Sequence, residues 1–166
     1  MTGVRFAPGD APRVLGVPAA ELTDQRVELD TIWDPARVQR ITELVAASTA
    51  AGAALEAVAL QCRPPADDDA ALVGSVVMLA KQGFGAAAIA DRVGLSARQL
   101  QRRSTAAFGY GTKTLSRILR MQRALTLVRR GERAADSAAG AGYADQAHLA
   151  RDVKELAGVT LGELTR

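Results

Sequence analysis

Apolar residues recur three and four positions apart along most of this 166-residue chain, the spacing of helices that bury one face. In the first third, Val38, Ile41 and Val45 follow this spacing directly after Asp34-Pro35. An aspartate before a proline suits an N-cap and the first position of a helix. A second helix with the same spacing is expected over about residues 51–61. The pattern predicts an all-α fold.

A Pro-Pro pair followed by an acidic run interrupts the helical pattern near residue 65. Because Pro-Pro resists helix and aspartates suit a helix N-terminus, we expect a linker over residues 62–68, with Asp68 or Asp69 capping the next helix. This divides the chain into a helical N-terminal segment, 1–61, and a second domain, 69–166.

The second domain contains two copies of one unit. The motif Ala-x-x-x-Gly occurs at Ala90–Gly94 and again at Ala138–Gly142. The motif Leu-x-Arg, with a glycine seven residues later, occurs at Leu100–Gly109 and again at Leu149–Gly158. Each copy therefore predicts a helix, a tight turn and a second helix, with glycine in the turn, where a positive φ is often needed.

Capping signals define the second helix of each copy. Ser96-x-x-Gln99 is a capping box, Asp145 suits an N-cap, and the glycines at 109 and 158 suit helix ends. These signals predict helices over about 97–107 and 146–157. A further capping box, Thr160-x-x-Glu163, predicts a short final helix.

The first of these helices carries a polar stripe opposite its apolar face. Arg98, Gln101, Arg102 and Thr105 are spaced three, four and seven positions from the first residue, which places them on one side. Arg pairs bidentately with guanine and Gln with adenine in the major groove of DNA. A solvated helix face is the alternative, but the duplication and the basic surroundings favour DNA.

The second copy has a shorter-chained stripe, Ala147, Ala150, Arg151 and Lys154, with Gln146 near its start. Arg151 is its best candidate for a base contact, and Lys154 suits a phosphate. Between the two copies, residues 112–130 form an apolar and basic segment that predicts one helix, about 28 Å long at 1.5 Å per residue. A stiff spacer of that length can hold two reading helices near one turn of DNA apart, about 34 Å.

Charge agrees with a polyanionic partner for the second domain. The net charge is only +3, but residues 1–70 carry 6 basic and 11 acidic side chains, whereas residues 71–166 carry 15 basic and 7 acidic. Between Arg92 and Arg133 there are 11 basic residues and a single acid, Glu132. Such a field attracts nucleic acid and speeds its encounter with the protein.

Other chemistries have little support. One cysteine, Cys62, and one histidine, His148, argue against disulfides, a metal site and a His-dependent catalytic triad, so neither cofactor nor enzymatic activity is expected. The 34 alanines and six aromatic residues favour a helical core of small side chains. The chain has no apolar run of 18 residues and no signal-peptide pattern, so we expect a cytoplasmic protein without membrane contact.

Three stretches resemble the DNA-binding domain of the AraC/XylS family of bacterial transcription regulators: residues 89–103 (IADRVGLSARQLQRR), 117–125 (RILRMQRAL) and 141–151 (AGYADQAHLAR). The resemblance implies seven helices, with two helix-turn-helix units joined by a long helix. It places the base contacts on Arg98, Gln101, Arg102, Gln146, Ala147, Ala150 and Arg151. We expect phosphate contacts from neighbouring residues: Arg103, Thr105, Lys113, Arg117, Arg120, His148 and Lys154.

The resemblance is incomplete at four positions. Ser104 and Ser137 stand where the family usually has a large apolar residue, and Thr112 and Leu161 replace prolines that are common at helix starts. Both serines put a hydroxyl at an expected core site, which costs stability unless it is hydrogen-bonded.

The N-terminal segment resembles, more weakly, the region that follows the β-barrel sensor of some family members. Its 61 residues cannot supply that barrel, so no small-molecule effector is evident; a natural short regulator, a fragment and an internally begun reading frame all fit. The resemblance implies double-stranded DNA as partner, and RNA polymerase when the protein activates. The alternative is an interaction protein that binds a partner through its acidic N-terminal helices and keeps the second domain as a scaffold.

Overall fold

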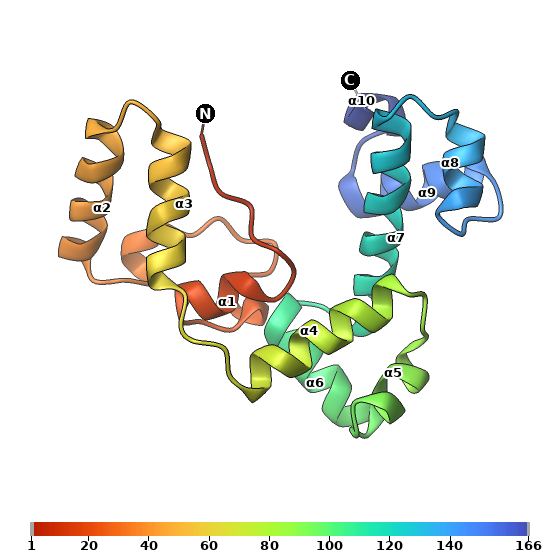
Figure 1. The fold of residues 1–166 in the computed structure, drawn as a ribbon, viewed down its shortest axis with the longest axis horizontal. Helices are drawn as coiled ribbons and strands as arrows, with labels where there is room; N and C mark the ends of the chain where they lie inside the picture. The colour runs from red at the N-terminus through yellow and green to blue at the C-terminus, as the bar shows by residue number, and fades with distance from the viewer. Residues whose placement is uncertain (1, 166) are drawn as a thin grey trace.

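A computed structural model describes residues 2–165, which form ten α-helices, two short 3₁₀ helices and no strand (Figure 1). The predicted all-α class is confirmed. Seven of the helices, α4 to α10, follow residue 67, and α7 runs between two helical groups (Figure 1). Within residues 2–165, no helix combines the length and the hydropathy that a bilayer span requires.

The N-terminal segment is a small helical arrangement with little core of its own. It contains α1 (Asp10–Leu15), η1 (Ala19–Glu21), η2 (Leu29–Thr31), α2 (Pro35–Ala47) and α3 (Ala51–Cys62). Asp34 caps α2 as predicted, because its carboxylate accepts a hydrogen bond from the Arg37 backbone N–H at 3.0 Å. The helices α2 and α3 pack against each other, yet neither contains a buried residue.

The start of α4 (Asp68–Lys81) differs from the prediction. Asp67 is its N-cap and accepts a hydrogen bond from the Ala70 backbone N–H at 2.8 Å, so Asp68 and Asp69 lie in the first turn instead of capping it. The helix therefore begins one residue inside the expected linker. Asp67 is the first aspartate after the prolines, with extended backbone that suits a cap, and the two later carboxylates still favour the positive helix end.

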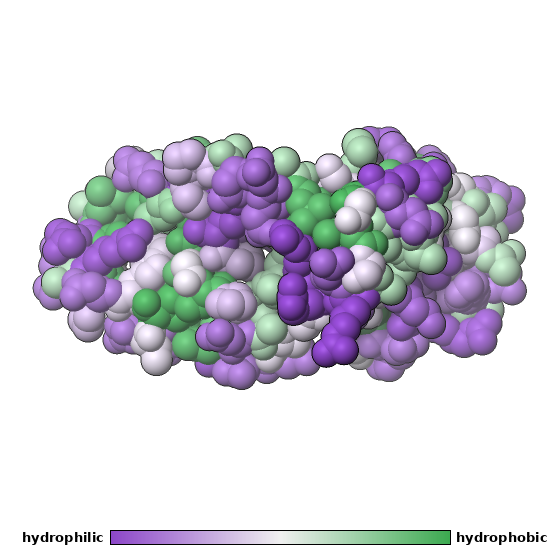
Figure 2. Space-filling view, turned by 90° about the horizontal axis from the view of Figure 1, so that it is seen from below, coloured by the Kyte–Doolittle hydropathy of each residue, from purple (hydrophilic) through white to green (hydrophobic). Residues whose placement is uncertain are grey.

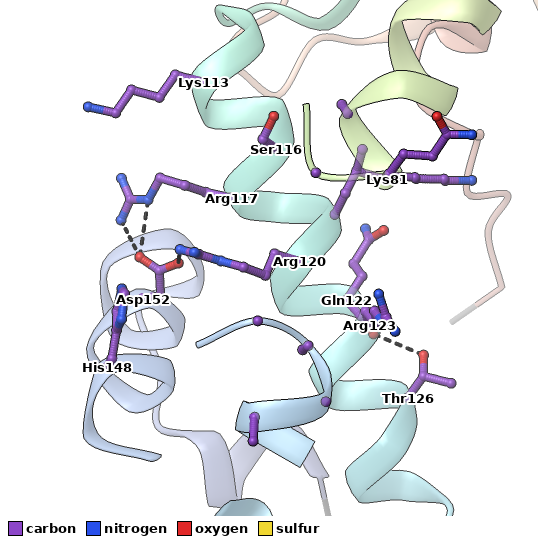
Figure 3. Close-up of a pocket in the computed structure, with 18 residues that line it drawn as sticks. Lys81, Lys113, Ser116, Arg117, Arg120, Gln122, Arg123, Thr126, His148 and Asp152 are labelled. Atoms are coloured by element: carbon purple, nitrogen blue, oxygen red, sulfur yellow. Dashed lines mark hydrogen bonds and ion pairs between the residues drawn. The ribbon is translucent and has the colours of Figure 1, made fainter. Parts of the chain in front are cut away.

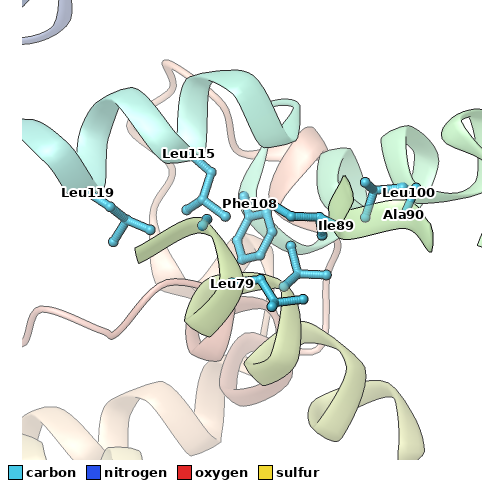
Figure 4. Close-up of a cluster of buried hydrophobic side chains, with 9 residues drawn as sticks. Leu79, Ile89, Ala90, Leu100, Phe108, Leu115 and Leu119 are labelled. Carbon is cyan, nitrogen blue, oxygen red and sulfur yellow. The ribbon is translucent and has the colours of Figure 1, made fainter. Parts of the chain in front are cut away.

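The first helix-turn-helix unit consists of α4, α5 (Ala86–Arg92) and α6 (Ala97–Phe108). The capping box of Ser96 and Gln99 is present, and Gly109 ends α6 with φ +82°. Residues from α4 to α7 form one hydrophobic cluster (Figure 4): Val76, Leu79, Ala80, Ile89, Ala90, Leu100, Phe108, Leu115 and Leu119. The start of α7 is therefore part of the first unit.

The second unit consists of α7 (Thr112–Arg129), α8 (Ala134–Gly140), α9 (Gln146–Ala157) and the short α10 (Leu161–Thr165). Its cluster is Met121, Ala124, Leu125, Ala138, Ala141, Tyr143, Leu149 and Val153. Because α7 buries side chains in both clusters, it is a rigid connection between the two units. Its 18 residues, one fewer than predicted, span about 27 Å.

The repeat is present in three dimensions, with an offset of 48 residues up to the turn. The backbone N–H of Phe84 bonds the Leu79 carbonyl, and that of Glu132 bonds the Leu127 carbonyl in the same way. The turn glycines Gly94 and Gly142 both have positive φ, +68° and +84°. The helix α4 is thus the counterpart of α7, and α6 is the counterpart of α9.

The two serines at core positions have different surroundings. Ser104 is buried in α6, and its hydroxyl lies 2.9 Å from the hydroxyl of Thr112, which is also buried. Ser137 in α8 is fully buried, and its hydroxyl has no hydrogen-bond partner within residues 2–165. The hydroxyl of Ser104 is therefore hydrogen-bonded by Thr112, which is itself a departure from the family pattern, whereas the hydroxyl of Ser137 is not hydrogen-bonded within residues 2–165.

The N-terminal segment packs on the first unit. Thr23 donates a hydrogen bond to the Gly109 carbonyl at 3.3 Å, at the end of α6. A Cβ at Gly9 would meet the Val73 side chain of α4, so only glycine allows this approach.

Seen from below, hydrophobic side chains still reach the surface in more than one place (Figure 2). The large exposed ones are Val27, Leu44, Leu60 and Met78.

Candidate nucleic-acid interface

The outer face of α6 is polar, long-chained and accessible. Arg98, Gln101 and Arg102 are exposed, while Leu100 and Ser104 on the inner face are buried. Within residues 2–165, neither Arg98 nor Arg102 forms a side-chain hydrogen bond or ion pair. Gln101 donates weakly to the Thr105 hydroxyl at 3.3 Å. Two guanidinium groups are therefore free to bind an external partner, and the Gln101 amide is held only by this long hydrogen bond.

The outer face of α9 presents fewer long side chains. Asp145 caps the helix as predicted, accepting a hydrogen bond from the His148 backbone N–H at 2.6 Å. Gln146, Ala147 and Arg151 are exposed and Ala150 is half-buried. Arg151 donates to the backbone carbonyl of Ala147 at 3.3 Å, and Lys154 donates to that of Gly158 at 2.9 Å. Within residues 2–165 these are the only side-chain hydrogen bonds of the two residues. Such contacts are easily exchanged for an external acceptor.

A wide groove lies along α7 between the two units (Figure 3). Its volume is about 1030 Å³, and its polar lining includes the basic side chains Lys81, Lys113, Arg117, Arg120 and Arg123, together with His148. Asp152 is the acidic residue in this lining. The groove therefore has the positive potential that a phosphate backbone prefers.

The buried Asp152 joins α9 to α7 through a partly buried ion-pair cluster (Figure 3). One carboxylate oxygen accepts hydrogen bonds from Arg117 Nη2 at 2.8 Å and Arg117 Nε at 3.1 Å. The other accepts from Arg120 at 3.1 Å and from the Tyr143 hydroxyl at 3.0 Å. Glu155 also pairs with Arg117, at 2.7 Å. Both arginines are thus directed to carboxylates of α9.

The ionisation of this cluster follows from these contacts. Burial raises the pKa of Asp152. The hydrogen bonds from Arg117, Arg120 and Tyr143 together lower this pKa by more than burial raises it, so the net shift is downward. Burial also raises the pKa of Tyr143 to about 12, with a further upward contribution from Asp152. Near neutral pH the cluster consists of the carboxylates of Asp152 and Glu155, two guanidinium groups and a neutral phenol.

Aromatic contacts complete the cluster. The Arg120 guanidinium lies over the Tyr143 ring, 4.2 Å from its centroid. The His148 ring meets the same tyrosine edge-on at 5.1 Å. Tyr143 is buried between them, in the turn that leads into α9. The start of α9 is therefore held by packing as well as by charge.

The structure separates the predicted phosphate-contacting residues into two groups. Lys113 is exposed and, within residues 2–165, has no side-chain partner, and Arg103 forms only an exposed ion pair with Asp69 at 2.8 Å. Arg117 and Arg120 are engaged by Asp152. Thr105 bonds the Gln101 carbonyl, and His148 and Lys154 have the contacts given above.

Sequence reasoning missed Asp152 and Tyr143. The signal was present for Asp152, which lies three residues after Leu149 and beside Val153, close to the apolar stripe of α9. A carboxylate beside the apolar face of a helix needs a partner of opposite charge if it is buried there. Outside this cluster, Cys62 accepts a hydrogen bond from Arg37 at 2.8 Å, and no group of His, Cys, Asp and Glu within residues 2–165 is arranged to hold a metal.

Comparison with known proteins agrees with this geometry. Residues 89–166 match a family described as a helix-turn-helix domain. No curated protein and no solved structure matches the chain. The matched range begins at the buried Ile89 in α5 and includes α6, α7 and α9, and thus both outer faces described above. Residues 89–166 are therefore a helix-turn-helix domain, and this match supports the resemblance to the DNA-binding domain of the AraC/XylS family of transcription regulators.

Proposed function

We propose that this regulator reads a specific DNA sequence by placing α6 and α9 in two successive segments of the major groove, on one side of the duplex. The observation that carries the proposal is that α7 is packed into the cores of both units. The helix α7 is about 27 Å long and is fixed at both ends, so it can hold α6 and α9 at a separation close to one turn of DNA, about 34 Å. A single chain would then bind an asymmetric site.

The two helices contribute differently in this proposal. Arg98, Gln101 and Arg102 of α6 supply three long side chains for base edges, with arginine suited to guanine and glutamine to adenine. On α9, Arg151 is the principal base contact, with Gln146 at the helix start. Ala147 and Ala150 allow close approach and can contact the methyl groups of thymine. We therefore expect more sequence information in the half of the site that α6 reads.

Phosphate contacts orient the protein and supply much of its affinity. The proposal assigns them to the exposed Arg103, Lys113 and Lys154 and to the half-buried Thr105 and His148. The ion pair of Arg103 with Asp69 is weak because both side chains are largely exposed, at 46% and 64%. Arg117 and Arg120 serve Asp152 instead.

The direct test is a gel-shift titration of the protein with duplex fragments of bacterial promoters, challenged with excess random-sequence competitor at moderate salt. The expected result is a shifted band on some fragments that survives the competitor. In the cell, we expect this protein to bind chromosomal DNA in the bacterial cytoplasm. As an activator it would also contact RNA polymerase. Binding that the competitor abolishes equally on every fragment contradicts the proposal.

One observation favours a second role as an interaction protein. The helices α2 and α3 contain no buried residue, and Leu44 and Leu60 are 55% and 69% exposed. A protein partner that packs against α2 and α3 would bury both leucines. If the gel-shift titration shows no specific band, binding of a protein partner through this segment becomes the better account.

A further inference from the structure

The two units share an ion pair at the same place with the charges exchanged. With the offset of 48 before the turn and 49 after it, Asp69 of α4 corresponds to Arg117 of α7, and Arg103 of α6 corresponds to Asp152 of α9. In both units the two residues are paired, at 2.8 Å. The recognition helix carries the cation in the first unit and the anion in the second.

The two pairs differ greatly in burial. The side chains of Arg103 and Asp69 are 46% and 64% exposed, whereas those of Arg117 and Asp152 are 26% and 7% exposed. An exposed ion pair fixes the orientation of its helix only weakly, because water and salt compete for both charged groups. A nearly buried carboxylate that loses its partners is costly, so its partners are strongly held. The second pair can therefore fix a helix orientation, and the first cannot.

The contacts of Asp152 join α9 to two other parts of the second unit. Arg117 and Arg120 come from α7, and Tyr143 comes from the turn between α8 and α9. Asp152 itself follows Arg151, the best candidate for a base contact on α9. Successive residues on a helix are separated by about 100°. Anchoring residue 152 to α7 thus sets the direction in which residue 151 points.

We propose that Asp152 is a positioning residue for DNA reading, which holds α9 at a fixed angle on α7 and so sets the spacing between the base contacts of α9 and those of α6. Arg117 and Arg120 act through this carboxylate and not on phosphates. The proposal rests on the proposed two-groove binding. It also explains the exchanged polarity, since a cation on α6 remains available to DNA, while the anion on α9 is buried away from it.

The first experiment measures spacing preference. The duplex that the wild-type protein selects from a random library is compared by fluorescence anisotropy with versions carrying one or two extra base pairs between its halves. We expect Asp152→Asn to weaken binding to the selected duplex about tenfold, the size of one lost base contact. We also expect it to reduce the penalty for an inserted base pair, while binding to the α6 half alone is unchanged. The control Asp136→Asn removes an exposed acid of α8 and should match wild type.

The second experiment measures salt dependence. A side chain that neutralises one phosphate contributes about 0.9 to the slope of log K against log salt concentration. Lys113→Gln should lower the slope by about that amount, and Arg117→Gln should lower the affinity without changing the slope. A thermal melt by circular dichroism confirms that each variant is folded at the assay temperature.

The outcomes are distinct. If Asp152→Asn keeps the wild-type spacing penalty, or Arg117→Gln lowers the slope as Lys113→Gln does, the positioning role is overturned. An equal loss on the α6 half alone also overturns it, because the effect is then not confined to α9. If the wild-type protein selects no sequence, the proposed function itself fails, which is a different result.

Discussion

The hydroxyl groups of Ser104 and Thr112 meet 2.9 Å apart inside the first helix-turn-helix unit. Each residue alone departs from what the family resemblance leads one to expect, a large apolar side chain on α6 and a proline at the start of α7. Together they satisfy each other, because a buried hydroxyl needs one good partner. The contact also joins α6 to the first residue of α7.

Replacing one of these two hydroxyl-bearing residues by an apolar residue should therefore lower the free energy of unfolding more than replacing both. Ser104→Ala leaves the Thr112 hydroxyl buried without its partner, and we expect the free energy of unfolding to fall by about 1–3 kcal/mol. Adding Thr112→Val should recover part of that loss. Chemical denaturation of the two single variants and the double variant measures the coupling, and strictly additive losses would contradict the assignment.

Ser137 provides the opposite case. Its hydroxyl is fully buried and unpaired within residues 2–165, so the folded state bears a desolvation cost with no hydrogen bond in return. We expect Ser137→Ala to raise the free energy of unfolding by about 1 kcal/mol. The comparison is a thermal melt against wild type and against Ser75→Ala, whose hydroxyl bonds a helix carbonyl. A clear loss of stability in Ser137→Ala would show that the hydroxyl is satisfied.

Asp152 makes the stability of the second unit depend on acid pH. Its pKa lies below the ordinary value of 3.8 in the folded protein, so its contribution is present above about pH 4 and is lost as the pH falls through the folded pKa. We expect Asp152→Ala to cost about 3 kcal/mol at pH 7, because it leaves two arginines without their buried partner. The difference from wild type should shrink in denaturant titrations below pH 4. A difference that stays constant from pH 7 to pH 3 would argue that the carboxylate charge is not involved.

Arg102 tests base reading by α6. Arg102→Ala should weaken binding to the selected duplex by about 1–3 kcal/mol and relax the preference at one base pair, because a bidentate contact to guanine is lost. Arg40→Ala, which removes an exposed arginine of α2, is the matched control and should leave binding unchanged. Equal losses on the selected and on random duplexes would reassign Arg102 to a phosphate.

The features that the sequence predicted well depend on neighbouring residues. The caps at Ser96 and Asp145 and the helix ends at Gly109 and Gly158 are set by one turn of chain, and the repeat reinforces them. Where two local choices were nearly equivalent, as among the three aspartates at 67–69, the prediction was off by one residue.

The ion-pair cluster could not be predicted in the same way. Whether Arg117 reaches Asp152, 35 residues away, depends on the angle at which α9 crosses α7, which no local pattern specifies. The same holds for the contact between Thr23 and Gly109, across 86 residues. The helices and the polar faces that they expose could therefore be predicted from the sequence, but the contacts that orient these helices could not.

The most direct measurement is selection of bound duplexes from a random DNA library by the wild-type protein. The account predicts one asymmetric sequence with two informative blocks whose centres lie about 10 base pairs apart, the block read by α6 being the stronger. A single block, or two blocks at a spacing that α7 cannot span, would contradict the claim that α6 and α9 read DNA together.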